Sequence, residues 1–119
     1  MILNVSEAEH QKALADWLDA IGVLWFHPPN GGHRHRAVAA RLKAEGVKAG
    51  VPDVWILTPP PRVPDARGVV VELKKKGGRL SSAQRRWLDE LAGLGWLTFV
   101  SHGWRPAVEW LEGLGYGTR

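Results

Sequence analysis

Hydrophobic positions along the chain follow two different spacings. Leu14, Leu18 and Ile21 recur every three or four residues, as on one face of a helix, and an S-x-x-E capping box begins at Ser6. This pattern predicts a helix over residues 6–21. Short apolar runs rich in β-branched and aromatic side chains, bounded by glycine or proline, predict strands. These runs cover residues 23–27, 53–57, 68–74 and 96–101.

Other segments return to helical spacing. Val38 and Leu42 lie four residues apart within a basic stretch that ends at a glycine. A second capping box, formed by Ser81 and Gln84, opens a helix, and Pro106 marks the start of another. We expect helices at 35–45, 81–92 and 106–114, and a proline-rich connection at 58–67.

Composition narrows the class of protein. Of the 119 residues, 45% are hydrophobic and none is cysteine, which excludes disulfide scaffolds, cysteine-based zinc fingers and cysteine nucleophiles. No apolar run reaches the roughly 18 residues of a membrane span, and the first residues lack a signal-peptide pattern. Together with the alternation of helices and strands, this predicts a single soluble α/β domain over residues 1–119, with a central mixed β-sheet flanked by helices, in the cytoplasm.

Positive charge is concentrated in the middle of the chain. The net charge is +4 and the isoelectric point is about 9.9. Residues 33–48 carry five basic side chains and one acidic one, and residues 62–86 carry eight basic and two acidic ones. Such clusters attract polyanions such as DNA or RNA through the release of counterions.

Two polar residues stand near the end of the apolar strand at 68–74. Residues two apart point to the same face of a strand, so we expect Glu72 and Lys74 to emerge together. A carboxylate beside an ammonium suits metal-assisted hydrolysis, in which the acid binds a hard cation and the lysine orients or deprotonates a water. An ion pair where a strand reaches solvent explains the same residues without any chemistry.

Asp53 adds an acid at the start of a different apolar strand. An ionised carboxylate at that position is costly unless it is hydrated, paired or bound to a metal ion. The simpler explanation is a turn residue after Pro52. Two successive strands that carry Asp53 and Glu72 would bring both acids to one cation, which is a more specific pattern than either acid alone.

These motifs, taken in order, resemble a known family. The G-V-P-D segment at 50–53, the V-V-E-L-K run at 70–74 and the S-S-A-Q segment at 81–84 resemble the PD-(D/E)XK nuclease superfamily, and within it the small VRR-NUC (virus-type replication-repair nuclease) domains. The resemblance covers nearly the whole chain. It implies a restriction-endonuclease-like core, to which this sequence adds a helix between the first two strands. It also implies an endonuclease that hydrolyses DNA phosphodiesters and leaves a 3′-hydroxyl and a 5′-phosphate.

The resemblance further implies roles for single residues. Asp53, Glu72 and the backbone carbonyl of Leu73 would bind one or two Mg²⁺ or Mn²⁺ ions, and Glu7 would complete the cluster. Lys74 would position or activate the attacking water. The family suggests work on branched or junction DNA in phage or bacterial replication, recombination or repair, and nicking of linear duplex is the simpler alternative. The small size of the chain favours a homodimer.

Glu7 and Gln84 each have a second explanation. The family carries an acid in an E-x-x-x-Q setting, which Glu7 and Gln11 match, but an acid in a first turn also stabilises the helix dipole. By resemblance Gln84 contacts the water or the phosphate near the metal, yet it also stands where it closes a capping box with Ser81.

Two other functions stay open at this point. His33 and His35 form an H-x-H motif that a zinc hydrolase would use, although no companion acid or third histidine stands at a recognisable spacing. A non-catalytic basic DNA-binding accessory module with the same fold is the other alternative. The seven tryptophans are best explained by core and interface packing. The residues expected to bind DNA are Arg34, Arg36, Arg41, Lys48, Lys75, Lys76, Arg79 and Arg85.

Overall fold

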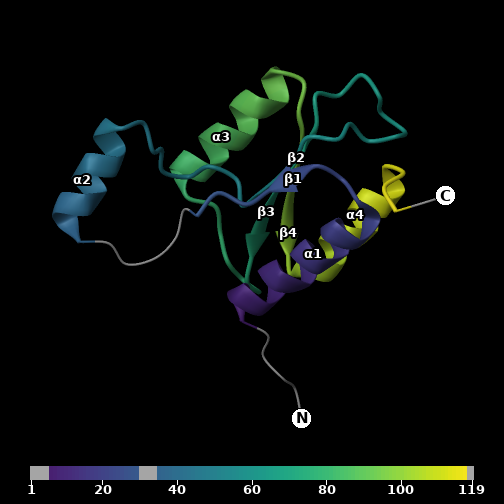
Figure 1. The fold of residues 1–119 in the computed structure, drawn as a ribbon, viewed down its shortest axis with the longest axis horizontal. Coiled ribbons are helices and arrows are strands. Elements are labelled where there is room, and N and C mark those ends of the chain that lie inside the picture. The colour runs from purple at the N-terminus through teal and green to yellow at the C-terminus, as the bar shows by residue number, and fades with distance from the viewer. Residues whose placement is uncertain (1–5, 30–34, 118–119) are drawn as a thin grey trace, which may run out of the picture.

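The computed structural model describes residues 6–29 and 35–117 and shows an α/β arrangement (Figure 1). Within these residues no helix is both long and apolar enough to cross a membrane. The elements, in chain order, are α1 (Glu7–Ile21), β1 (Trp25–Phe26), α2 (Arg36–Ala44), β2 (Val54–Ile56), β3 (Val69–Lys74), α3 (Ser82–Gly93), β4 (Leu97–His102) and α4 (Trp104–Gly113).

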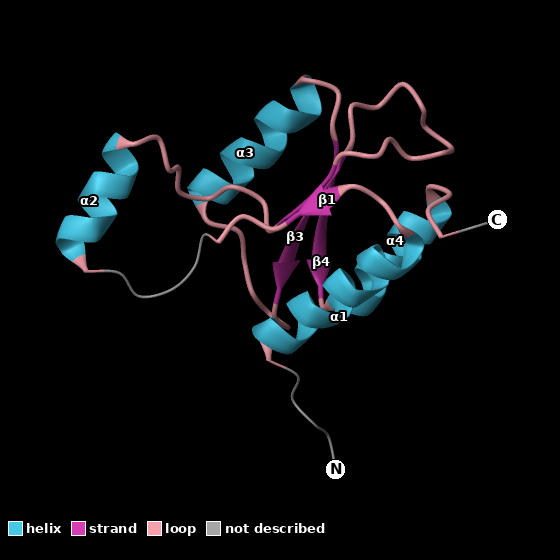
Figure 2. Cartoon of the chain, viewed as in Figure 1, coloured by secondary structure: helices cyan, strands magenta, loops and turns pink. Residues whose placement is uncertain are grey.

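The strands form one four-stranded sheet in the order β1-β2-β3-β4 (Figure 2). The pairs β1/β2 and β2/β3 are antiparallel, and β3/β4 is parallel because the chain crosses over through α3 between them. The predicted mixed sheet flanked by helices is therefore confirmed. Val54 pairs with Val71, so Asp53 and Glu72 come next to each other at the end of the ladder.

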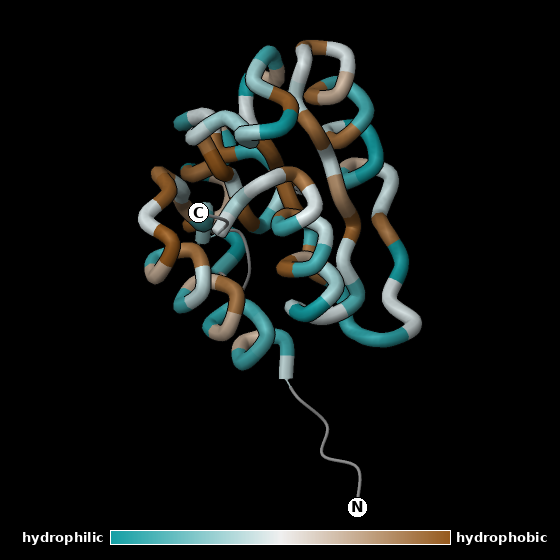
Figure 3. The backbone as a smooth tube through the Cα atoms, turned by 90° about the vertical axis from the view of Figure 1, so that its right-hand side faces the viewer, coloured by the Kyte–Doolittle hydropathy of each residue, from teal (hydrophilic) through white to brown (hydrophobic). Residues whose placement is uncertain are grey.

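Helices cover both faces of the sheet. Helices α1 and α4 cover one face, where Leu14, Leu18 and Leu111 pack on Val54 and Val71 in the larger core. Helix α3 covers the other face with a smaller core. Figure 3 shows the hydrophobic stretches of the chain gathered along the strands between the helices. All seven tryptophans pack against one core or the other, as expected: Trp17, Trp25, Trp104 and Trp110 on the larger, and Trp55, Trp87 and Trp96 on the smaller.

Element boundaries differ most from the predictions in two places. The first strand is shorter than the apolar run at 23–27, because only Trp25 and Phe26 pair with β2. The last helix begins at Trp104 rather than at Pro106, and Gly103 is its N-cap. A proline is still tolerated there, since the N–H groups of a first helical turn have no partner within the helix.

The predicted basic helix forms as α2, but it is not part of either core. None of its residues is buried, and Figure 1 shows it apart from the sheet and the other helices. Its N-cap is His35, whose Nδ1 accepts a hydrogen bond of 3.4 Å from the backbone N–H of Ala37. This gives His35 a structural role that needs no metal.

The proline-rich connection ties the ends of two helices together. The guanidinium of Arg62 donates to the carbonyl of Gly113 at the end of α4, at 3.0 Å. The guanidinium of Arg67 donates to the carbonyl of Leu94 at the end of α3, at 2.8 Å. Carbonyls at a helix C-terminus lack partners within the helix, so these contacts cap both helices. The segment therefore has a structural use far from the predicted catalytic residues.

Candidate active site

A recess of about 210 Å³ opens at the end of the sheet where β2 begins and β3 ends. It contains every residue for which the family resemblance implies a role in catalysis or metal binding. Its lining consists of Glu7, Gly50, Val51, Asp53, Glu72, Leu73, Lys74 and Gln84. Residues from four separate segments of the chain thus meet at one place. They meet because β2 and β3 pair in this register and because α3 packs on the sheet beside them.

Asp53 is held by the turn that precedes β2. Its Oδ2 accepts a hydrogen bond of 2.8 Å from the backbone N–H of Leu73 on the neighbouring strand. Two indoles fix the turn itself, since Trp55 donates to the carbonyl of Pro52 and Trp87 to that of Ala49, each at 3.0 Å. The carboxylate therefore stands in a set position at the sheet end.

The turn before β2 requires glycine at position 50. Its φ is +82°, and a Cβ placed there would lie 2.8 Å from the Cβ of Ala83 and 2.9 Å from the backbone nitrogen of Gln84. No side chain fits at such a distance, and only glycine adopts this backbone conformation without strain. Gly50 lets the turn that carries Asp53 lie directly against the start of α3.

Glu72, Lys74 and Gln84 form a connected polar network. The ammonium of Lys74 donates to Gln84 Oε1 at 2.7 Å and lies 3.5 Å from Glu72 Oε2. The amide Nε2 of Gln84 donates to Glu72 Oε2 at 3.2 Å. Gln84 Oε1 also accepts from the backbone N–H of Ser81 at 2.9 Å, so the predicted capping box is present as well. The capping explanation of Gln84 is therefore confirmed, while its contact with the water or the phosphate stays a prediction.

The environment of Glu72 favours its protonated form. Its side chain is 4% exposed, and that of Lys74 is 15% exposed. Burial, the largest cause, and the nearby Asp53 carboxylate together raise the pKa of Glu72 to about 8 against the opposing effect of Lys74. Asp53 and Glu72 thus lie close together at a place where burial and their mutual repulsion disfavour the ionisation of both carboxyl groups.

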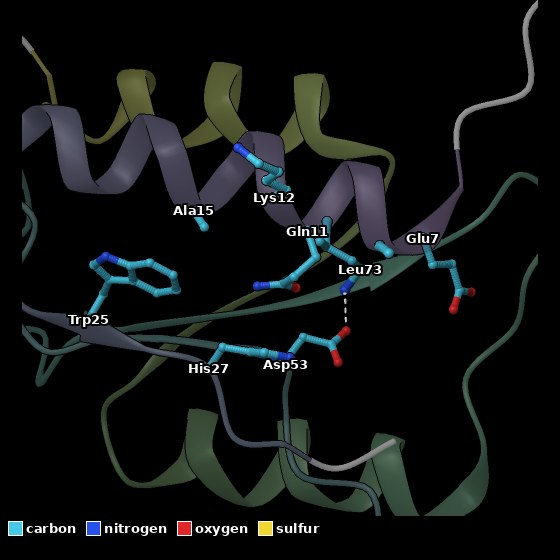
Figure 4. Close-up of a pocket in the computed structure, with 9 residues that line it drawn as sticks. Glu7, Gln11, Lys12, Ala15, Trp25, His27, Asp53 and Leu73 are labelled. Atoms are coloured by element: carbon cyan, nitrogen blue, oxygen red, sulfur yellow. Dashed lines mark hydrogen bonds between the residues drawn. The ribbon is translucent and has the colours of Figure 1, made fainter. Parts of the chain in front are cut away.

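Glu7 lines the recess but is not brought against the other acids. It lies in the exposed first turn of α1, and Figure 4 shows its carboxylate apart from that of Asp53. Across residues 6–29 and 35–117 no three His, Cys, Asp or Glu side chains are grouped closely enough to hold a metal ion. The structure therefore brings Asp53 and Glu72 together, without Glu7 as a third acid.

The donor atoms at the recess nevertheless fit a hard divalent cation. Carboxylate and carbonyl oxygens are the ligands that Mg²⁺ prefers. The N–H of Leu73 points to Asp53, and the N–H and C=O of one strand residue point the same way, so the Leu73 carbonyl faces the same side. A cation there would also relieve the repulsion between Asp53 and Glu72 that contributes to the raised pKa of Glu72.

The predicted DNA-binding residues fall into two groups. Lys75, Lys76 and Arg79 are exposed in the connection that follows β3, and Arg85 is exposed beside Gln84 on α3. The second group is exposed on or just after α2, away from the sheet, and consists of Arg36, Arg41 and Lys48. Arg34 and His33 lie outside the described residues. The first group lies next to Lys74 and Gln84 in the sequence. The second group would extend a DNA contact surface beyond the recess.

Sequence reasoning missed the residues on the other side of Asp53. The ring nitrogen Nδ1 of His27 forms a hydrogen bond with the carbonyl of Asp53, and Trp25 lies on the same strand segment. Figure 4 shows both near Gln11 of α1. In the sequence His27 is only a polar residue at the end of an apolar run, which is too common a pattern to single it out.

Comparison with known proteins agrees with this geometry. The family model for the VRR-NUC domain matches residues 5–104. The chain belongs to the VRR-NUC family. A solved structure described as a VRR_NUC domain protein shares the fold, with a TM-score of 0.77 and 23% sequence identity over 98% of this chain and 94% of that one. No curated protein matches the chain significantly.

Membership of the VRR-NUC family confirms the resemblance seen in the sequence. The matched residues include the whole recess, from Glu7 to Gln84. VRR-NUC is a nuclease family, and membership implies a nuclease that acts on DNA. A nuclease domain also accounts for the exposed basic side chains beside the recess, because a phosphate backbone needs cations at its contacts.

Proposed function

We propose that this VRR-NUC domain is a Mg²⁺- or Mn²⁺-dependent endonuclease that hydrolyses phosphodiester bonds in DNA. One observation carries the proposal: Asp53, Glu72, Lys74 and Gln84 line a single recess. Two acids, a lysine and an amide in one place supply what phosphodiester hydrolysis requires, namely a cation site and groups that orient a water and a phosphate.

Asp53, Glu72 and the carbonyl of Leu73 would hold the cation. When bound, the cation neutralises charge that develops on the phosphate oxygens. The hydrogen bond from the Leu73 N–H fixes one oxygen of Asp53 and leaves the other available. Gln84 fixes the Glu72 carboxylate in the same way through Oε2. Glu7, which lines the same recess, would join the ligands through a water or after a change of side-chain conformation.

Lys74 would act on the water and the phosphate. Its ammonium is held by Gln84 Oε1 and by Glu72, which leaves donor capacity for a further partner, since an ammonium has three N–H groups. In this position Lys74 would orient the attacking water and stabilise negative charge as the P–O bond breaks. Gln84 keeps the ammonium in the recess rather than in solvent.

Exposed cations beside the recess would position the DNA backbone. Lys75, Lys76, Arg79 and Arg85 supply phosphate contacts next to Lys74 and Gln84. Such contacts fix the register of the duplex and carry no sequence information. Helix α2 would add Arg36 and Arg41 at a second point along the DNA.

Cleavage assays with variants test the proposal. Labelled duplex, single-stranded and four-way-junction DNA are incubated with Mg²⁺, Mn²⁺ or EDTA and with wild-type, Lys74→Ala or Lys75→Ala protein. We expect products only with a divalent cation, a loss of about 10²- to 10⁴-fold in rate for Lys74→Ala, and near wild-type turnover for Lys75→Ala at saturating DNA. Tight binding of DNA without cleavage products in the presence of either metal would contradict the nuclease proposal and favour a non-catalytic DNA-binding accessory module.

Finer aspects of the function stay predictions. Preference for branched or junction DNA and a role in phage or bacterial replication, recombination or repair are expected from the resemblance, and a cytoplasmic location is expected from the sequence pattern. A homodimer is expected because one domain of this size covers a limited stretch of duplex. The four-way junction in the assay addresses the substrate, and sedimentation of the free protein and of its DNA complex addresses the dimer.

A further inference from the structure

Ring N–H groups hold the main chain of the turn that carries Asp53. The indoles of Trp55 and Trp87 donate to carbonyls earlier in the turn, and His27 Nδ1 bonds the carbonyl of Asp53 itself. Both indoles also pack against the smaller core, which accounts for their positions. His27 is exposed, so core packing does not account for its contact with Asp53.

The direction of the His27 contact follows from its partner. A carbonyl oxygen can only accept a hydrogen bond, so Nδ1 of His27 carries a proton and is the donor. His27 comes directly after β1, and Phe26 of that strand pairs with Trp55 of β2. The antiparallel register therefore brings His27 alongside the start of β2, next to Asp53.

Asp53 is thus held from two neighbouring strands. Leu73 of β3 donates its backbone N–H to the carboxylate Oδ2 at 2.8 Å, and His27 holds the backbone carbonyl from the side of β1. Figure 4 shows Asp53 between the His27 ring and the Leu73 backbone. The Leu73 contact fixes one carboxylate oxygen, whereas the His27 contact fixes the backbone from which the side chain extends. Together they set the direction of the second carboxylate oxygen.

The position of Asp53 needs this support because Glu72 lies next to it. When both carboxylates are ionised they repel each other, and Asp53 is one cause of the raised pKa of Glu72. A turn that was free to move would carry Asp53 away from Glu72. A cation would then have to bring the two acids together again, and that cost would lower its affinity.

Resting on the proposed nuclease function, we propose that His27 is a positioning residue of the active site. Its ring N–H holds the backbone of Asp53, so that the carboxylate stays where it binds the divalent cation together with Glu72. Loss of a hydrogen bond that supports a metal ligand typically lowers metal affinity about 10- to 100-fold. A residue that served only the fold would change stability and not cation affinity, and a DNA contact would change DNA affinity.

Cation binding to the DNA-free protein tests this role without relying on turnover. Wild-type, His27→Ala and His27→Asn proteins are freed of metal and titrated with Mn²⁺ by isothermal calorimetry. We expect the Mn²⁺ affinity of His27→Ala to fall about tenfold. The affinity of His27→Asn should stay within about threefold of wild type, because the asparagine amide places an N–H donor near the position of Nδ1.

His102→Ala is the matched control. His102 is also exposed, and its ring Nε2 bonds a backbone carbonyl, that of Gly78, at 3.0 Å. Gly78 contributes no predicted metal ligand, so this variant should bind Mn²⁺ as the wild type does. Thermal unfolding in EDTA checks that each variant is folded. If His27→Ala does not fold, His27→Phe, which keeps a ring but has no N–H donor, takes its place.

Two results would overturn the role of His27. One is equal Mn²⁺ affinity of wild type and His27→Ala. The other is an equal loss in His27→Ala and His27→Asn, because the N–H donor would then not be the cause. In cleavage assays His27→Ala should need about tenfold more Mg²⁺ for half its maximal rate and approach the wild-type rate at saturation.

Failure of this role is distinguishable from failure of the nuclease proposal. A wild type that binds Mn²⁺ and cleaves DNA, with His27→Ala indistinguishable from it, refutes the role of His27 alone. A wild type that neither binds Mn²⁺ nor cleaves DNA refutes the nuclease proposal and, with it, the role of His27.

Discussion

Lys74 and Gln84 form a hydrogen bond of 2.7 Å between the ammonium and the amide oxygen, and the same oxygen closes the N-terminal cap of α3. One side chain thus joins the terminus of α3 to β3. Because the amide nitrogen also reaches Glu72, the orientation of the amide is set by three partners. The position of Lys74 therefore depends on how α3 is seated against the sheet.

The two roles of Gln84 can be separated by mutation. Ser81→Ala removes the capping hydroxyl but leaves the side chains of Lys74 and Gln84 in place, so it should cost about 1 kcal/mol of unfolding free energy with little change in cleavage rate. Gln84→Ala should cost a similar amount of stability and also slow cleavage about 10- to 100-fold, since it removes the anchor of Lys74. Thermal unfolding and single-turnover rates at saturating DNA measure the two effects. Equal rate losses in both variants would mean that Gln84 acts only as a cap.

Helix α2 should contribute affinity and not turnover. None of its residues is buried, it lies apart from the sheet, and Arg36 and Arg41 stand on it. Each arginine-to-alanine change should reduce the slope of log binding constant against log salt concentration by about 1 and leave the rate at saturation unchanged. Arg105→Ala serves as the control, because Arg105 stacks on Trp104 at the start of α4. An unchanged slope would remove α2 from the DNA contact surface.

Local pattern was enough to predict the elements but not all of their relations. Capping residues and apolar spacing placed α1 and α3 closely, because those signals act within a few residues. The pairing of β2 with β3 depends on contacts between distant segments, and the sequence offered no rule for it beyond the family resemblance. Within the site, Asp53 and Glu72 met as expected, whereas Glu7 sits in an exposed first turn that no packing directs towards them.

The isolated position of α2 was also beyond local reasoning. Val38 and Leu42 have the spacing of an apolar helix face, yet Val38 is 39% exposed and no residue of the helix is buried. The periodicity of apolar residues shows that a helix has an apolar face. It does not show whether another part of the protein covers that face. In the same way, the sequence could show that Gln84 closes a cap but not that its amide reaches across to Lys74.

Gly50 should be required for both folding and cleavage. Gly50→Ala places a Cβ 2.8 Å from Ala83 and adds the strain of a φ of +82°, so we expect a loss of several kcal/mol or a shift of the turn that carries Asp53. Gly46→Ala is the matched control, since its φ is +105° but no atom lies within 4 Å of the added Cβ. Gly46→Ala should cost only about 1 kcal/mol and keep cleavage. Chemical unfolding and cleavage rates distinguish strain, common to both, from the clash that only Gly50→Ala introduces.

The raised pKa of Glu72 predicts how the stability of the metal-free protein depends on pH. The pKa is about 8 in the folded protein, against an ordinary value of 4.5. Between these values the folded state holds a proton that the unfolded state has released, so the free energy of unfolding falls as pH rises. The loss is at most about 1.4 kcal/mol per pH unit and ends above the folded pKa.

Thermal unfolding in EDTA from about pH 5 to about pH 9 measures this slope, and Glu72→Gln should flatten it, because glutamine carries no charge at any pH. Glu90→Gln, at an exposed residue of α3 that pairs with Arg86, should keep the wild-type profile. Mg²⁺ should raise the unfolding temperature more near pH 9 than near pH 6, since the cation competes with the proton for the carboxylate. Identical pH profiles for wild type and Glu72→Gln would show that Glu72 is ionised in the metal-free fold, and the cation would then bind without releasing a proton from Glu72.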